Sequence, residues 1–201
     1  MKNLGIANPF AQAYFSVFCK NLKEMKNLAV FCGSKDGLDP QFLQEATTFG
    51  NLLGAAGMSL VYGGGNKGLM GAVASGAMAA GVKVIGVIPE LLIAWEHQHE
   101  GISELHVVSD MHVRKKMMYE LCDAALILPG GNGTLDELFE MLTWNNLKIH
   151  NKKVFILNID GYYDALIQLL ENMDTNGFMY DNWKDRIIVC HSVEALKPLL
   201  S

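Results

Sequence analysis

One segment, Pro129-Gly-Gly-Asn-Gly-Thr-Leu-Asp-Glu137, carries most of the information on the architecture of this 201-residue chain. An apolar run, Ala124 to Leu128, precedes it, and an amphipathic helical pattern follows it to Leu147. Glycines lack a Cβ and let the backbone approach a ligand, and the free N–H groups of a first helical turn attract anions. The segment therefore predicts a strand, a glycine loop and a helix N-terminus that together bind a phosphate.

Glu137 lies about one helical turn beyond this predicted phosphate site, and two interpretations of it are open. Thr134 and Glu137 have the spacing of a capping box, in which both side chains bond free backbone N–H groups of the helix. A carboxylate beside an anion site is also suited to chemistry on the sugar that carries the phosphate. Taken alone, the Thr-x-x-Glu spacing favours the cap.

A second glycine loop, Gly63-Gly-Gly-Asn-Lys-Gly68, follows a short apolar run and opens a helix of small residues. Gly63, Gly65 and Gly68 also spell G-x-G-x-x-G, the dinucleotide fingerprint. The fingerprint is weak here because no acidic residue clearly ends the next strand at the spacing that a ribose needs, Glu90 being the nearest. Two glycine loops at the ends of different strands predict a mononucleotide site at the carboxyl edge of a parallel sheet.

Apolar strands alternate with helices from Leu28 to the C-terminus. This order predicts an α/β fold, a Rossmann-like doubly wound parallel sheet of about seven strands with helices on both faces. The expected strands cover residues 28–32, 59–62, 82–88, 105–108, 124–128, 154–158 and 187–189. The expected helices cover 40–56, 111–121, 135–147, 162–173 and 193–199, with another from the second glycine loop to about residue 80. Residues 89–101 are expected to be less regular.

The chain is expected to form one domain, residues 27–201, preceded by an accessory segment, residues 1–26, with Met25 as a second candidate start. The accessory segment is a poor signal peptide because Pro9 and Gln12 interrupt its apolar part. It also falls short of the roughly 20 apolar residues that a membrane span needs. No membrane association is expected.

Charge and cysteine usage limit the possible partners and the compartment. A net charge of −5 and a pI near 5.6 offer no general attraction to a nucleic acid polymer. The four cysteines, Cys19, Cys32, Cys122 and Cys190, lie far apart and form no C-x-x-C. Reduced thiols and a cytoplasmic protein are therefore expected.

A basic cluster, Arg114-Lys-Lys116, lies in the helix that follows Asp110. Such a cluster is usually a solvated helix face. This helix, however, begins at the carboxyl end of a predicted strand, the same edge as the glycine loops, so its first turns can face the pocket. An arginine there offers a planar fork for phosphate or ribose oxygens, and a neighbouring lysine adds a point charge.

At these residues the chain resembles the Lonely-guy (LOG) family of cytokinin riboside 5′-monophosphate phosphoribohydrolases, long labelled lysine decarboxylases. The similarity extends from about Leu28 to the C-terminus. The matching motifs are Tyr62-Gly-Gly-Gly with Gly68-Leu-Met-Gly71, Val84-Ile-Gly-Val-Ile-Pro89, Asp110-Met-His-x-Arg-Lys115, Pro129-Gly-Gly-x-Gly-Thr-x-x-Glu137 and Asn158-x-Asp-Gly-Tyr-Tyr163. No constellation for pyridoxal phosphate, which needs a Schiff-base lysine with a pyridinium partner, is found in the sequence.

The resemblance implies a Rossmann-like homodimer without a cofactor. It would hydrolyse the N-glycosidic bond of a nucleoside 5′-monophosphate, AMP or an N6-modified AMP, to free base and ribose 5-phosphate. Arg114 and Glu137 match the family's catalytic pair. The residues that match substrate contacts are Glu96, Lys115, Gly131, Asn132, Gly133, Thr134 and Thr143. Asn132 replaces a commoner aromatic or aliphatic residue, which leaves the base preference open.

No metal is expected, because His97, His99 and His112 do not form a zinc-like spacing with further ligands. Two other function classes remain open. One is a non-catalytic nucleotide-binding sensor that uses the same pocket. The other is a dinucleotide-dependent oxidoreductase, which only the G-x-G-x-x-G spelling favours.

Overall fold

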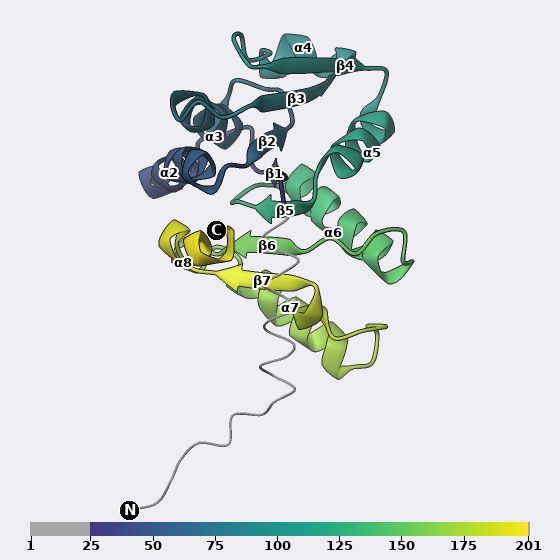
Figure 1. The fold of residues 1–201 in the computed structure, drawn as a ribbon. Helices are drawn as coiled ribbons and strands as arrows, with labels where there is room; N and C mark the ends of the chain where they lie inside the picture. Colours follow the sequence, from purple (N-terminus) through teal and green to yellow (C-terminus); the bar gives the residue numbers. More distant parts are fainter. Residues whose placement is uncertain (1–24, 201) are drawn as a thin grey trace, which may run out of the picture.

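The computed structural model describes residues 25–200, which fold into one seven-stranded sheet with helices on both faces (Figure 1). The order of strands is β4-β3-β2-β1-β5-β6-β7, and every neighbouring pair is parallel. The strands are β1 (Asn27–Phe31), β2 (Ser59–Tyr62), β3 (Val84–Pro89), β4 (Glu104–Val108), β5 (Ala124–Ile127), β6 (Val154–Leu157) and β7 (Ile187–Cys190). The predicted fold class is confirmed.

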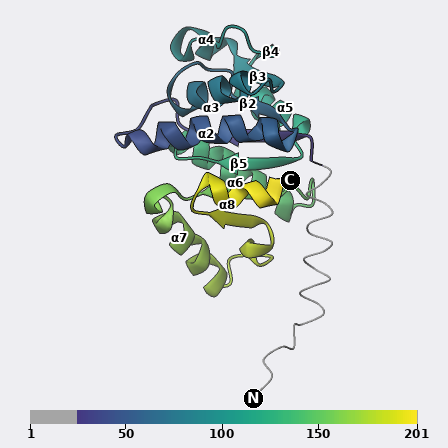
Figure 2. The ribbon, with the colours of Figure 1, turned by 60° about the vertical axis from the view of Figure 1, so that its left-hand side comes forward.

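Two apolar layers, one on each face of the sheet, form the core. Alternate residues of a strand point to opposite faces, so Leu28 and Val30 of β1 join one layer while Ala29 and Phe31 join the other. The first layer packs against α2 (Pro40–Ala56), α3 (Gly68–Ala79) and α8 (Val193–Leu200), and Figure 2 shows α2 between the other two. The second packs against α5 (Met111–Leu121), α6 (Asn132–Asn146) and α7 (Asp164–Thr175). Both faces of the central strands are thereby buried, whereas the edge strand β4 stays partly exposed.

Local sequence sets the limits of α2. The Asp39 carboxylate accepts a hydrogen bond of 2.9 Å from the Gln41 N–H, and Pro40 is the first helical residue. Gly57 ends the helix in the left-handed conformation, with φ of 65°. The sequence-based limits of this helix are confirmed.

Other elements differ from the expectation. Residues expected to be irregular contain a short helix, α4 (Glu90–Glu96), whose seven residues are too few to establish a helical period. Helix α6 begins at Asn132 rather than at Leu135. Its first residues, Asn-Gly-Thr, have low helix propensity, which is why the pattern alone places the start too late. Two short 3₁₀ turns, Ile159–Gly161 and Trp183–Asp185, precede α7 and β7.

Cys122 and Cys190 are buried and free, which confirms the prediction of reduced thiols for these two, and Cys32 is buried as well. Cys19 and the accessory segment up to residue 24 lie outside the described residues.

Candidate active site

The order of strands reverses between β1 and β5, so the loops that follow these two strands diverge at the carboxyl edge of the sheet. Open parallel sheets bind ligands at such a point. A cavity of about 540 Å³ lies there, lined by residues 33–35 after β1, residues 129–131 after β5, and the first turns of α5 and α6. Its volume is in the range of small-molecule sites, roughly 300–1,000 Å³.

The N-terminus of α6 opens into this cavity. Gly131 is the N-cap and has no capping side chain, and its carbonyl accepts the first helical hydrogen bond, 3.1 Å, from the Leu135 N–H. A Cβ on Gly131 or Gly133 would meet nothing within 4 Å, so both glycines face open space. Together with Asn132 and Thr134 they line the cavity. The cavity at which the anion site is predicted therefore contains a helix N-terminus whose first N–H groups have no partner within the helix.

Gly130 has a different role from the glycines that follow it. A Cβ there would lie 2.1 Å from Thr134 Oγ1 and 2.9 Å from the Gly33 nitrogen. The missing side chain therefore lets the loop after β5 pack against the start of α6 and the loop after β1.

The capping-box interpretation of Thr134 and Glu137 is wrong. Thr134 is the third residue of α6 rather than its N-cap, and Glu137 is the sixth. Glu137 is 9% exposed and lines the cavity, about one turn beyond the start of α6. Its position fits the second interpretation, in which the carboxylate faces the sugar of a bound nucleotide.

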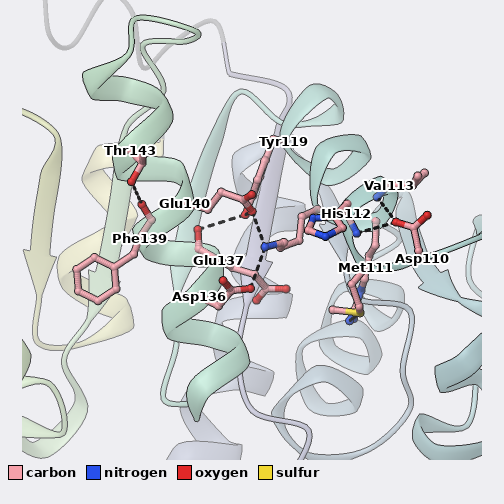
Figure 3. A network of polar contacts seen from close by, with 12 residues as sticks. Asp110, Met111, His112, Val113, Tyr119, Asp136, Glu137, Phe139, Glu140 and Thr143 are labelled. Atoms are coloured by element: carbon pink, nitrogen blue, oxygen red, sulfur yellow. Dashed lines mark hydrogen bonds and ion pairs between the residues drawn. The ribbon is translucent and has the colours of Figure 1, made fainter.

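Arg114 lines the same cavity from α5. The residue is 5% exposed, and its guanidinium donates two hydrogen bonds to backbone carbonyls, from Nε to Val87 at 3.1 Å and from Nη2 to Gly63 at 3.0 Å. The helix that carries it is capped by Asp110, whose carboxylate accepts from the N–H groups of His112 and Val113 at 2.9 Å (Figure 3). The hydrogen bond from the Val113 N–H is the main reason why the pKa of Asp110 is lowered. The structure thus brings the predicted pair, Arg114 and Glu137, to one cavity.

Lys115 does not line the cavity. Its Nζ lies 2.9 Å from a carboxylate oxygen of Asp136 and 2.8 Å from one of Glu140, between α5 and α6. Tyr119 donates a 2.8 Å hydrogen bond to the same Glu140 carboxylate (Figure 3). Burial lowers the pKa of Lys115, but hydrogen bonds and charges of Glu140 and Asp136 outweigh it and the pKa is raised. The lysine is a charged link between two helices.

The second glycine loop is packed rather than open. A Cβ on Gly64 would lie 3.1 Å from the Ile88 Cβ, and one on Gly68 would lie 2.4 Å from the Lys35 backbone nitrogen. The loop after β1 therefore covers the N-terminus of α3. Of the loop's glycines, Gly63 alone lines the cavity. The loop thus contributes Gly63 to the cavity, while Gly64 and Gly68 serve close packing.

One further predicted residue, Thr143, is not brought to the cavity. Thr143 is exposed on α6, and its hydroxyl donates 2.8 Å to the Phe139 carbonyl one turn earlier (Figure 3). It lies six residues after Glu137, so the helical period directs it to a different side. Glu96 ends α4, and its side chain is outside what the structure describes.

The structure adds cavity residues that were not predicted as site residues from the sequence. Ser34 and Lys35 line the cavity from the loop after β1, and Tyr162 lines it while donating 2.8 Å to the Gly130 carbonyl. The position of residues 33–35, directly after the first strand of a doubly wound sheet, was the available signal. An apolar part of the lining comes from positions on several elements, of which Leu69, Met70 and Met111 lie within the matched motifs: Phe42, Leu69, Met70, Leu92, Met111 and Met118.

Within residues 25–200, no group of three or more His, Cys, Asp or Glu side chains could hold a metal ion. None of the helices in this part of the chain is long and apolar enough to cross a membrane.

Comparison with known proteins identifies a matching family model and similar proteins that share one name. The family model described as "Possible lysine decarboxylase" matches residues 70–200. A cytokinin riboside 5′-monophosphate phosphoribohydrolase from Rhodococcoides fascians is 44% identical over 170 residues, covering 84% of this chain and 86% of that protein. The enzyme LOG7 of the same name from Arabidopsis thaliana is 45% identical over 154 residues, covering 77% of this chain and 71% of that protein.

Solved structures show the same architecture. The molybdenum cofactor binding protein from Rippkaea orientalis aligns with a TM-score of 0.66 at 23% identity, covering 87% of this chain and 94% of that one. At this identity the likeness concerns the fold alone.

Proposed function

The chain belongs to the family of cytokinin riboside 5′-monophosphate phosphoribohydrolases, and we propose that it hydrolyses the N-glycosidic bond of a nucleoside 5′-monophosphate to free base and ribose 5-phosphate. The observation that carries the proposal is one cavity holding a helix N-terminus with open glycines, and the side chains of Arg114 and Glu137. The helix N-terminus suits a phosphate, and Arg114 and Glu137 suit the sugar beside it.

The substrate is AMP or an N6-modified AMP, with its 5′-phosphate at the first turn of α6. Gly131, Asn132, Gly133 and Thr134 supply the backbone N–H groups, and Lys35 supplies a positive charge from the opposite loop. The apolar part of the lining, which includes three methionines, offers a flexible surface for a base and an alkyl substituent.

Cleavage of the bond between C1′ and the base nitrogen develops positive charge on the ribose ring. Glu137 stabilises that charge and orients or deprotonates the attacking water, while Arg114 holds ribose or phosphate oxygens. Phosphate binding at α6 positions the sugar, so binding energy remote from the bond contributes to the rate. The reaction needs no cofactor.

The other function classes receive less support. Gly63, Gly65 and Gly68 form the dinucleotide fingerprint, but the N-terminus that they precede is covered by the backbone at Lys35. A pyrophosphate therefore has no access to it in this arrangement. A non-catalytic sensor would use the same cavity as the hydrolase, and catalytic turnover separates the two.

We also propose a cytoplasmic homodimer. Leu91 and Trp95 of α4 are 72% and 74% exposed, and Val107 and Val113 are also exposed, which supports an apolar contact surface. The buried free thiols of Cys122 and Cys190 support a reducing compartment. Sedimentation equilibrium at micromolar concentration tests the dimer, and a monomer under these conditions would contradict it.

The function is tested by incubating the protein with a panel of nucleoside monophosphates, their nucleosides and NAD, and by measuring free base and ribose 5-phosphate. We expect equal amounts of both products from AMP or an N6-alkyl AMP and little from nucleosides. Binding of AMP without release of base would support the sensor instead.

A further inference from the structure

The guanidinium of Arg114 is held by the backbone of β3 and by the residue that follows β2. Its Nε donates to the Val87 carbonyl in β3, and its Nη2 donates to the Gly63 carbonyl directly after β2. A guanidinium is planar, so hydrogen bonds from two of its nitrogens fix both its position and the direction of its remaining N–H groups. The orientation of Arg114 in the cavity therefore depends on the backbone at these two points.

Gly63 contributes more than a carbonyl. A Cβ at this position would lie 2.1 Å from Nη2 and 3.2 Å from Cζ of Arg114, and 3.0 Å from Met70 Sδ. The space that a side chain would fill is thus occupied by the guanidinium. Backbone conformation does not explain the glycine, because Gly63 has no positive φ, whereas Gly64 has φ of 81°.

We propose that Gly63 is a positioning residue for Arg114: its carbonyl orients the guanidinium and its missing side chain makes room for it. The first residue of the second glycine loop then acts on catalysis through the arginine rather than by binding the phosphate itself. The catalytic part of this inference rests on the proposed function, whereas the structural coupling of the two residues does not.

A thermal stability cycle tests the coupling. Gly63→Ala is expected to lower the melting temperature by on the order of 5 °C, because the new methyl group displaces a buried guanidinium. In an Arg114→Ala background the methyl group enters vacated space, and the same substitution should lower the melting temperature little or raise it. Gly33→Ala is the control, because its Cβ would meet only backbone atoms at 3.4–3.5 Å. Its effect should be equal in both backgrounds.

If Gly63→Ala lowered the melting temperature equally in both backgrounds, the proposal would be overturned. It would also be overturned if neither protein with Gly63→Ala folded while Arg114→Ala alone folded. Restored folding in the double variant supports it. This cycle needs no activity, so it decides the coupling even if the wild-type protein releases no base, a result that would contradict the proposed function alone.

Turnover tests the consequence for catalysis. Measured well below the melting temperature, Gly63→Ala should lower kcat by on the order of 10²-fold, the effect of misplacing a catalytic group by about 1 Å. KM should change much less, because the phosphate site at α6 is untouched. Wild-type kcat in the Gly63→Ala protein would overturn the positioning role.

Discussion

The ammonium group of Lys115 lies 2.8 Å from a carboxylate oxygen of Glu140, and this ion pair links α5 to α6. Lys115 is only 10% exposed at its side chain. Because these helices carry Arg114 and Glu137, the ion pair helps to set the relative position of the two candidate catalytic residues that line the cavity. Lys115, the residue after Arg114, therefore influences the site by linking the two helices, and it does not line the cavity itself.

Replacing Lys115 by methionine should lower stability and leave substrate affinity nearly unchanged. The substitution removes the cation from Asp136 and Glu140, and an expected loss of about 1–3 kcal/mol reflects a pair whose partners are partly exposed. Urea unfolding and KM for AMP are the measurements. Lys116→Met is the control, because its 3.8 Å pair with Glu120 is exposed on both sides. If stability were unchanged and KM for AMP rose tenfold or more, the result would show that Lys115 contacts the substrate.

The substitution Gly133→Ala tests phosphate binding at the start of α6 separately from the stability of that helix. The residue is helical and a Cβ would face open space, so alanine should keep or raise the melting temperature. The methyl group would intrude on a phosphate at the helix N-terminus, and KM for AMP should rise about tenfold or more. Gly130→Ala is the contrasting variant, and it should lose stability because of the contact with Thr134. Unchanged KM in Gly133→Ala would show that the phosphate binds elsewhere.

Lys35 lines the cavity and Lys115 does not. We therefore expect Lys35 to supply the positive charge beside the phosphate. Lys35→Met should raise KM for AMP roughly tenfold, the size of one charge-assisted hydrogen bond, and should weaken the dependence of KM on salt. Adenosine turnover is the internal control, since a nucleoside has no phosphate and should be unaffected. Equal effects on AMP and adenosine would rule out this role.

His150 should make the protein sensitive to acid. Burial first, and then the positive charges of Lys152 and Arg186, lower its pKa from 6.5 to about 4. The unfolded chain binds this proton below pH 6.5 and the folded chain does so only near pH 4, so the contributed stability is present above pH 6.5 and falls between these values. The melting temperature of His150→Gln should decline less over this range than that of the wild type. Parallel declines would contradict the assignment.

Patterns of sequence that depend on local chemistry predicted the fold well. The limits of α2 follow from Asp39, Pro40 and Gly57, and the parallel sheet follows from apolar runs separated by helices. The anion loop at Gly131 was predicted because strand, glycines and helix are consecutive in the chain. Local chemistry was thus sufficient where a feature is built from neighbouring residues.

Features that depend on tertiary contacts were not predictable. Glycines at 63 and 131 are equivalent in sequence, yet one faces Arg114 and the other faces open space. The direction of Lys115 depends on two carboxylates 21 and 25 residues away, and α4 is too short to show its period. The apolar lining of the cavity comes from several elements that meet only in the folded chain.

The central claim is that Glu137 acts on the sugar of a bound nucleotide, and the most direct test is base release by Glu137→Gln. Glutamine keeps the size of the side chain but carries no charge to stabilise an oxocarbenium ion and accepts no proton from water. We expect the variant to bind AMP in equilibrium dialysis and to release base at least about 10²-fold more slowly, whereas the exposed Glu120→Gln control on α5 keeps the wild-type rate. Base release by Glu137→Gln at the wild-type rate would contradict the claim.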